Sequence, residues 1–591
     1  MTNSRNTIKT LADVLVVVEK AHIQPWQRRD MRSAINRVAE MAGVAPVTAE
    51  ATAPALRQML KGVLPAAHGV SQKTWANMLS GLRAALRLAG VIDSRREGLA
   101  LKDPAWAPLV EAIASDRRLS CGLAASVNYC ASKAVTPDQV DDAVVQQFHV
   151  WLEERTLCPK PKDIVRQVPH LWNEASERIG CWPKTKLALL SFRAPQRRLR
   201  WVALPESFRN DGEAYLAMRA DPDIFDERPN APTKRLAPST LHQQREHLRL
   251  AASVLVESGI AVEEITALAD LVQPERFKTI LRHYHEAADG QPNAFATGLA
   301  QTLLQVARHH LPLTEEEFSH LKRIAAKLPA IPLELTPKNK ALLRKFESDE
   351  MKARLYFLPD TLQAEVTKAL EKGRLLFVAA QMAVAIDIQL AIGLRPQNLS
   401  ALHWRRHFLE PDGPRGRLLL LIPAAEMKSR KKDFVTEVAN EVAQRLRWYR
   451  RTILPRLSAD PNGDLFVTSK GTRKDQRTLT LQMLWTIERR LGVHLTTHQY
   501  RHLLGTSYLD ANPHDTETPR LLLGHSWTKT TRIYVGSQTR RASRAYNDFL
   551  FEQRERLKLR RKGQLRRKPR VNIKQDKPTS KEDQGEPTCA D

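Results

Sequence analysis

Side chains capable of chemistry gather in four short segments of the last third of the sequence. A histidine and an arginine three positions apart on a helix share one face, which alone is more often a surface pair. An arginine after a helix can simply cap it, and a lysine in a turn is ordinary solvated charge. The segments are "GLRPQNL", "EMKSRKKD", "THQYRH" and "LLGHSWTKTTRIYV", and they contain Arg395, Lys428, His498, Arg501, His525 and Tyr534.

In this order the four segments resemble the catalytic domain of the tyrosine recombinases, also called the phage integrase family. The family pattern has an apolar helix ending in Gly-Leu-Arg and then a helix closing on Leu-x-Trp, as "ALHW" does here. A β-hairpin carrying a lysine follows, then His-x-x-Arg, then "LGH" with a tyrosine nine residues after its histidine. The resemblance is close over about residues 345–550 and looser over 235–330, which are similar to the family's helical core-binding domain.

The resemblance implies that Tyr534 attacks a DNA phosphodiester and becomes a 3′-phosphotyrosyl, which stores the broken bond for religation. A tyrosine with a pKa of about 10 is ionised in roughly one molecule in a thousand at neutral pH, so it needs help. Arg395 and Arg501 would hold the non-bridging oxygens through charge-assisted bonds and offset the charge that develops in the transition state.

The other three residues would handle protons and the phosphate. By the same resemblance, His498 orients the tyrosine or accepts its proton, and His525 donates to a phosphate oxygen. Lys428 is the general acid that protonates the departing 5′ hydroxyl, although Lys431 and Lys432 would take this role in a different hairpin register. This chemistry requires no metal or nucleotide cofactor, and the sequence contains no GxxxxGK loop.

One position departs from the family pattern. Many members carry a glutamate three residues after the first arginine, where this chain has Asn398. That departure puts the rate and the positioning of the arginine in question more than activity as such. Of the other tyrosines in the region, Tyr500 and Tyr508 are expected to pack within a helix, and Tyr546 lacks the required spacing from "LGH".

Charge and composition narrow the class of partner. The 591 residues contain 92 Lys and Arg against 65 Asp and Glu, a net charge of +27. Such an excess favours a polyanion, most simply double-stranded DNA, whereas a ribosome-associated or merely basic protein is the alternative. The five cysteines form no CxxC pair and read as reduced cytosolic thiols, mostly in cores. We therefore expect a cytoplasmic, nucleoid-associated protein without a membrane segment.

The elements that must position these residues are mostly helical. The apolar stretch 375–394 approaches the length of a membrane span, but Gln381, Asp387 and Gln389 interrupt it, so it is predicted to be a buried core helix. Pro396 suits the first turn of the next helix. The stretch "GRLLLLIPAAEMKSRKKDFVTEV" predicts a β-hairpin. The expected fold is mainly α and multidomain, with helical DNA-binding modules before a mixed α+β catalytic domain with a small antiparallel sheet.

Apparent repeats organise the N-terminal half. "MRSAINRVAEMAGV" followed by "SQKTWANMLSGLRAALRLAGVI" resembles "LRLAASVLVESGI" followed by "AFATGLAQTLLQVARHHL", with a weaker copy between them, which suggests up to three helical modules. Similar composition alone would explain the middle copy equally well. Pro-rich stretches at 228–240 and 327–340 predict linkers. The expected domains are 1–110 (helical module), 111–230 (second helical region and linker), 231–335 (core-binding domain), 345–550 (catalytic domain) and 551–591 (basic, disordered tail).

The sequence thus predicts a site-specific recombinase or integrase that acts on double-stranded DNA as a homo-tetramer, alone or together with related recombinases, in the integration or transposition of a mobile element. The helix expected after the nucleophile, "RRASRAYNDFLFEQRERL", docks on a neighbouring protomer or on its own domain. Two alternatives stay open: a hairpin-forming resolvase or type IB-like topoisomerase, and a catalytically inactive DNA-binding partner of another recombinase.

Overall fold

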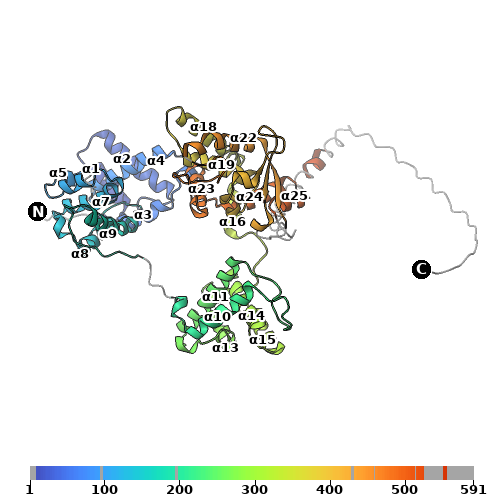
Figure 1. The fold of residues 1–591 in the computed structure, drawn as a ribbon. Coiled ribbons are helices and arrows are strands. Elements are labelled where there is room, and N and C mark those ends of the chain that lie inside the picture. Colours follow the sequence, from blue (N-terminus) through green and yellow to red (C-terminus); the bar gives the residue numbers. More distant parts are fainter. Residues whose placement is uncertain are drawn as a thin grey trace, which may run out of the picture. The chain divides into compact units, whose positions relative to one another are not determined.

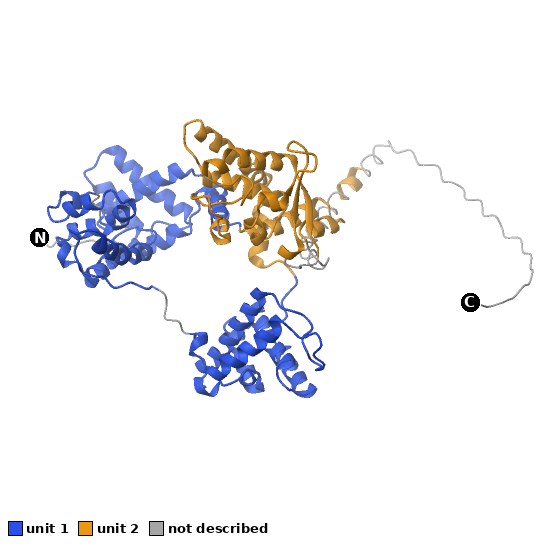
Figure 2. Ribbon diagram, viewed as in Figure 1, with its two compact units in different colours: residues 1–333, 481–495 blue, residues 334–480, 496–591 orange. Residues whose placement is uncertain are grey.

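The computed structural model describes residues 8–93, 98–192, 198–427, 432–457, 459–512, 514–524 and 550–555. The chain divides into two compact units (Figure 2), one of residues 1–333 with 481–495 and the other of residues 334–480 with 496–591. The described part is mainly helical with one three-stranded antiparallel sheet, which confirms the predicted fold class. No helix within the described ranges combines the length and apolar character needed to cross a membrane.

The first unit opens with two helical groups, each with its own buried core. Long helices pair in both: α2 packs on α4, and α7 packs on α9. Figure 1 shows these elements in the blue to green part of the ribbon. The helices are α1 (Leu11–Lys20), α2 (Pro25–Met41), α3 (Ala53–Lys61) and α4 (Gln72–Leu88), then α5 (Leu99–Lys102), α6 (Ala107–Ala112), α7 (Arg117–Ser132), α8 (Asp142–Glu154) and α9 (Pro161–Arg178).

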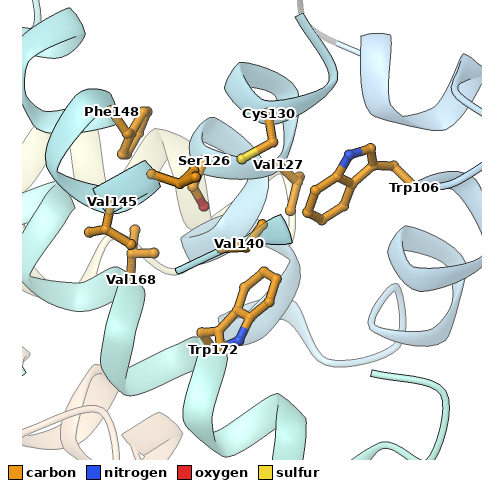
Figure 3. Close-up of a pocket in the computed structure, with 10 residues that line it drawn as sticks. Trp106, Ser126, Val127, Cys130, Val140, Val145, Phe148, Val168 and Trp172 are labelled. Atoms are coloured by element: carbon orange, nitrogen blue, oxygen red, sulfur yellow. The ribbon is translucent and has the colours of Figure 1, made fainter. Parts of the chain in front are cut away.

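The second of these groups encloses an apolar pocket (Figure 3). Trp106 and Trp172 lie on two of its sides, and Cys130 and Phe148 are among the other lining residues. The hydroxyl of Ser126 donates to the carbonyl of Leu123 at 2.9 Å, so it is satisfied within its own helix. The pocket is part of a packed core and carries no group for chemistry.

A third helical group completes the unit, and its core corrects one prediction. Phe208 and Tyr215 of α10 share that core with Leu248 and Leu303. The Pro-rich stretch 228–240, predicted to be a linker, is therefore a loop inside this group up to residue 237 and the first turn of α11 from Pro238; we propose that the group begins near residue 198 rather than at 231. The helices are α10 (Glu206–Ala220), α11 (Pro238–Glu257), α12 (Ala269–Val272), α13 (Pro274–Glu286), α14 (Ala294–His309) and α15 (Glu315–Ala325).

The third group also contains a pair of long helices in contact, because α11 packs on α14. These pairs, α2 with α4, α7 with α9 and α11 with α14, contain the stretches that look alike in the sequence. A common origin for the three modules stays a prediction. Of the cysteines, Cys130 and Cys158 are buried, whereas Cys121 and Cys181 are exposed and so are not core residues.

The second unit is built around α19, a helix that is buried along most of its length. Its character as a core helix is confirmed. Helices α18 and α22 pack against it, and α24 contacts it near its end. The helices are α16 (Pro337–Lys345), α17 (Asp349–Tyr356), α18 (Leu358–Leu370), α19 (Phe377–Ala391), α20 (Pro396–Ser400), α21 (Trp404–His407), α22 (Asn440–Thr452), α24 (Thr497–Ala511) and α25 (Glu517–Leu522); α23 (Gln476–Leu491) has residues in both units.

The sheet of this unit has the strand order β1-β2-β3, with β1 (Phe408–Leu409), β2 (Leu418–Ile422) and β3 (Phe434–Val438). Strands β2 and β3 pair antiparallel from Leu418 with Val438 to Ile422 with Phe434, which confirms the predicted hairpin. Alternate residues of β2 are buried, as expected for a sheet with one face on a core.

Candidate active site

The site begins where α19 ends. Gly393 has φ +65°, the left-handed conformation that commonly terminates a helix. A Cβ atom at this position would lie 2.7 Å from Leu504 Cδ1 and 3.2 Å from Leu523 Cδ2. Both the backbone angle and the close approach therefore require glycine, which explains the glycine of the Gly-Leu-Arg segment in physical terms.

Arg395 follows at the start of the next helix. It is the N-cap residue of α20, with Pro396 in the first turn as predicted. The amide of the buried Gln389 donates to the carbonyl of Leu394 at 2.9 Å, which holds the backbone just before the arginine. The Arg395 guanidinium is half-buried, and this burial lowers its pKa. No carboxylate within the described part of the chain pairs with it to offset that effect.

Arg501 ties three of the four motif segments together. It lies on α24, whose start is stabilised by a capping box between Thr496 and Gln499. The Arg501 side chain is buried; it donates to the carbonyl of Gly393 at 2.5 Å and to that of Leu523. These two bonds fix the plane of the guanidinium, which has five N–H donors in all.

A small pocket lies between these arginines and the base of the hairpin. Gly524, with φ +58°, approaches the hairpin closely: a Cβ there would lie 3.5 Å from Met427 Cε and 3.9 Å from Phe434 Cδ2. Met427 and Gly524 are the described residues that directly precede Lys428 and His525. The pocket is lined by Gly393, Leu394, Arg395, Asn398, Ile422, Met427, Phe434, Arg501, Leu522, Leu523 and Gly524. All four motif segments thus reach one place.

His498 lies on the first turn of α24 and is exposed. Its ring stands edge-on to that of His502, with ring centroids 5.0 Å apart. Burial, with the nearby charges of His498 and Arg501, lowers the pKa of His502 to about 4, so this imidazole is neutral at neutral pH. Sequence reasoning missed His502, although its spacing of four from His498 on a helix indicated that the two side chains are neighbours.

The described tyrosines of this region are not suited to be the nucleophile. Tyr500 is fully buried, and burial raises its pKa far above its usual value. Tyr508 donates its hydroxyl to Asp515 Oδ2 at 2.7 Å. The burial of Tyr500 agrees with the packing role predicted for it, whereas Tyr508 is half-buried, and its packing role stays a prediction. Lys428, Lys431, His525, Tyr534 and Tyr546 lie outside the described residues, as does most of the predicted C-terminal helix, of which 550–555 are helical.

Comparison with known proteins identifies this part of the chain. Residues 364–541 match the model of the phage integrase family. The tyrosine recombinase XerC of Pseudomonas fluorescens is 31% identical over 180 residues, which cover 30% of this chain and 56% of the relative. XerC of Pseudomonas syringae pv. tomato is 30% identical over 182 residues, again 56% of its length. The chain spans about half the length of the curated relatives it matches.

Among solved structures, the recombinase XerH bound to its difH substrate before cleavage is 17% identical, with a TM-score of 0.35 over 57% of this chain and 96% of that one. The XerA recombinase is 18% identical, with a TM-score of 0.22. The pocket that Arg395 and Arg501 line lies within the segment that matches the family model. Residues 364–541 thus match the phage integrase family, and the curated relatives of this segment are tyrosine recombinases.

Proposed function

We propose that this protein is a site-specific DNA recombinase that cuts and rejoins strands through a 3′-phosphotyrosyl intermediate. The observation that carries the proposal is the half-buried Arg395 guanidinium, which lines the same pocket as Arg501 and has no carboxylate partner in the described part of the chain. A partly desolvated cation without an internal counter-charge favours binding of an external anion. A phosphodiester has the charge and the paired oxygens that two guanidinium groups bind.

The reaction then follows from the groups around this pocket. Arg395 and Arg501 hold the two non-bridging oxygens of the scissile phosphate and stabilise the charge that builds up in the transition state. The hydroxyl oxygen of Tyr534 attacks phosphorus, and the bond from phosphorus to the 5′ oxygen breaks.

Three further residues complete the set. His498 accepts or relays the proton of the tyrosine, and His525 donates to a phosphate oxygen. Lys428 gives a proton to the departing 5′ oxygen. Rejoining reverses these steps with the 5′ hydroxyl of another strand.

The helical modules outside the second unit are proposed to have a role in DNA binding and assembly. Residues 1–333 lie outside the segment that matches the family model, and we propose that their helical modules bind DNA or assemble the complex. Integration or transposition of a mobile element, by a homo-tetramer on double-stranded DNA, suits a recombinase with such additional modules. The competing candidate, a catalytically inactive DNA-binding partner, is disfavoured by the complete set of six residue types, and Asn398 is its only support.

A covalent trapping experiment tests the proposal and requires no defined target site. The purified full chain is incubated with supercoiled plasmid that carries the DNA flanking its own gene, and SDS traps any adduct. We expect a covalent complex with free 5′ hydroxyl ends that is lost in Tyr534→Phe, while DNA binding is retained. Tyr508→Phe is the matched control, because it removes only the hydroxyl that bonds Asp515. Tight binding without an adduct would favour the inactive partner, and an adduct that survives Tyr534→Phe would exclude this nucleophile.

A further inference from the structure

The short turn that leads from β2 toward Lys428 is held by polar contacts that the proposed mechanism does not use. The 3-10 turn Ala424–Glu426 follows β2 after Pro423, and the backbone N–H of Met427 donates to the carbonyl of Ala424 at 3.0 Å. The side chain of Met427 is buried and lines the arginine pocket. Met427, the residue before Lys428, is therefore fixed at the pocket that Arg395 and Arg501 line.

Glu426 is the centre of these contacts. Its carbonyl accepts a hydrogen bond from the Asn398 amide at 3.2 Å. Its carboxylate lies 3.1 Å from His407 Nε2 and 3.7 Å from Arg406 Nη1. Glu426 is thus joined to α20 through its backbone and to α21 through its side chain.

The His407 ring is oriented for this contact. It is 1% exposed, and its Nδ1 accepts the backbone N–H of His403 at 3.0 Å. In the neutral imidazole the proton must then be on Nε2, which donates to Glu426. A second contact holds the base of the hairpin, because the backbone N–H of Ala424 donates at 2.7 Å to Oδ1 of Asp433, the residue before β3. Asn398, the position where the chain departs from the family pattern, is part of this network.

We propose that Glu426, held by His407 and Asn398, is a positioning residue that places the general acid Lys428 for the cleavage step. This inference rests on the proposed function. Lys428 is only two residues beyond Glu426, so a shift of the turn moves the lysine directly. A displacement of about 1 Å of a reacting group can cost about 100-fold in rate. Glu426 itself transfers no proton to the substrate.

A substrate with sulfur in place of the bridging 5′ oxygen separates positioning of the acid from all other effects. An alkoxide needs a proton as it leaves, because water and alcohols have a pKa of about 16. A thiolate, with a thiol pKa of about 8.5, leaves without one. A variant that has lost only the correct placement of Lys428 therefore regains cleavage on the sulfur substrate, whereas a variant with a damaged fold does not.

The experiment uses the full chain and a duplex with the sulfur at the cleavage position mapped by covalent trapping. Lys428→Ala and Glu426→Ala are compared on the oxygen and sulfur substrates. Glu426→Gln keeps an acceptor for His407, and Glu437→Ala is the matched control on the exposed face of β3. We expect about a 100-fold loss of cleavage for Glu426→Ala on the oxygen substrate, recovery to near the wild-type rate on sulfur, unchanged DNA affinity, and near wild-type rates for Glu426→Gln and Glu437→Ala.

Every other outcome contradicts either the positioning role of Glu426 or the proposed function. If sulfur rescues Lys428→Ala but not Glu426→Ala, the positioning role is wrong. If Glu426→Ala cleaves the oxygen substrate at the wild-type rate, Glu426 does not place the acid. If sulfur fails to rescue Lys428→Ala, the general acid is another residue, and the positioning role falls with it. If wild-type protein forms no adduct on either substrate, the proposed function itself fails.

Discussion

The guanidinium of Arg501 donates to the backbone carbonyl of Gly393, although the two residues are 108 positions apart. The same guanidinium also donates to the carbonyl of Leu523. One buried side chain of α24 therefore joins the end of α19 to the segment that precedes His525. The arginine proposed to bind phosphate is also the residue that holds the motif segments together, so the structure of the site and its chemistry share one group.

Gly393→Ala tests this junction. The substitution places a Cβ 2.7 Å from Leu504 Cδ1 and imposes a left-handed angle on alanine. We expect a loss of about 2–4 kcal/mol in the free energy of unfolding, from backbone strain and overpacking together, and a loss of the covalent adduct. Gly413→Ala is the control, because its φ is +81° but no atom lies within 4 Å of the new Cβ. Urea unfolding of both variants separates the two contributions, and equal losses would show that crowding at Gly393 is unimportant.

His502 is expected to make the stability of the second unit depend on pH. Burial, chiefly, lowers its pKa to about 4 in the folded chain, whereas an unperturbed histidine has a pKa of about 6.5. Between these values the unfolded state binds a proton that the folded state does not. The contribution of His502 to the free energy of unfolding is therefore fully present above about pH 6.5. It is lost as the pH drops toward 4, and the loss is at most about 3 kcal/mol.

Hydrogen exchange of the α24 amides, corrected for intrinsic rates, measures this dependence. We expect faster opening at pH 5 than at pH 7.5 in the wild type. His502→Gln, which cannot become charged, should show a smaller change between the two pH values. The same change in both proteins would assign the pH dependence to other groups.

A buried ion pair supports the helix that carries the site. Arg445 of α22 donates to Asp387 of α19 at 2.7 Å and to Asp360 of α18 at 2.6 Å. Burial is the main cause that raises the pKa of Asp387, and Arg445 opposes it, so the charged form of this carboxylate depends on Arg445. Arg445→Met should cost about 3 kcal/mol, because it leaves Asp387 uncompensated. Thermal unfolding measures the loss.

The double variant Arg445→Met with Asp387→Asn identifies the cause. It should recover part of the stability, since the uncompensated charge is gone. Arg417→Met, at an exposed pair with Asp412, should change stability by less than about 1 kcal/mol. No recovery in the double variant would mean that lost packing, and not the buried charge, explains the effect.

Local signals in the sequence predicted the parts of the site that depend on local structure. Two apolar runs around a charged turn predicted the hairpin, and Pro396 predicted the start of α20. The polar residues that interrupt the apolar stretch 375–394 predicted a buried core helix rather than a membrane span. Each of these features follows from residues close together in the chain, so the pattern contains the information. The gathering of four segments followed from the family resemblance, since no single segment specifies its distance from another.

What the sequence did not predict depends on contacts between distant elements. His407 and Glu426 look like ordinary surface residues until α21 and the 3-10 turn after β2 are brought together. The burial of His502 likewise depends on what packs over one face of α24. The assignment of 228–240 as a linker was wrong for the same reason: a Pro-rich loop and a linker have the same composition, and only the core that Phe208 shares with Leu248 distinguishes them.

Arg501→Lys separates the two roles of this arginine. Lysine keeps the positive charge, but a single ammonium cannot reproduce the flat, five-donor geometry that bonds Gly393 and Leu523 and still faces a phosphate. We expect DNA affinity to change by less than about threefold, because the charge is retained. Covalent adduct formation should fall by about 100- to 1,000-fold, since the contact tightens in the transition state. Arg417→Lys, at its exposed pair with Asp412, should leave both quantities unchanged. Binding by fluorescence anisotropy and cleavage by SDS trapping measure the two effects, and equal losses in both would reduce Arg501 to a binding residue.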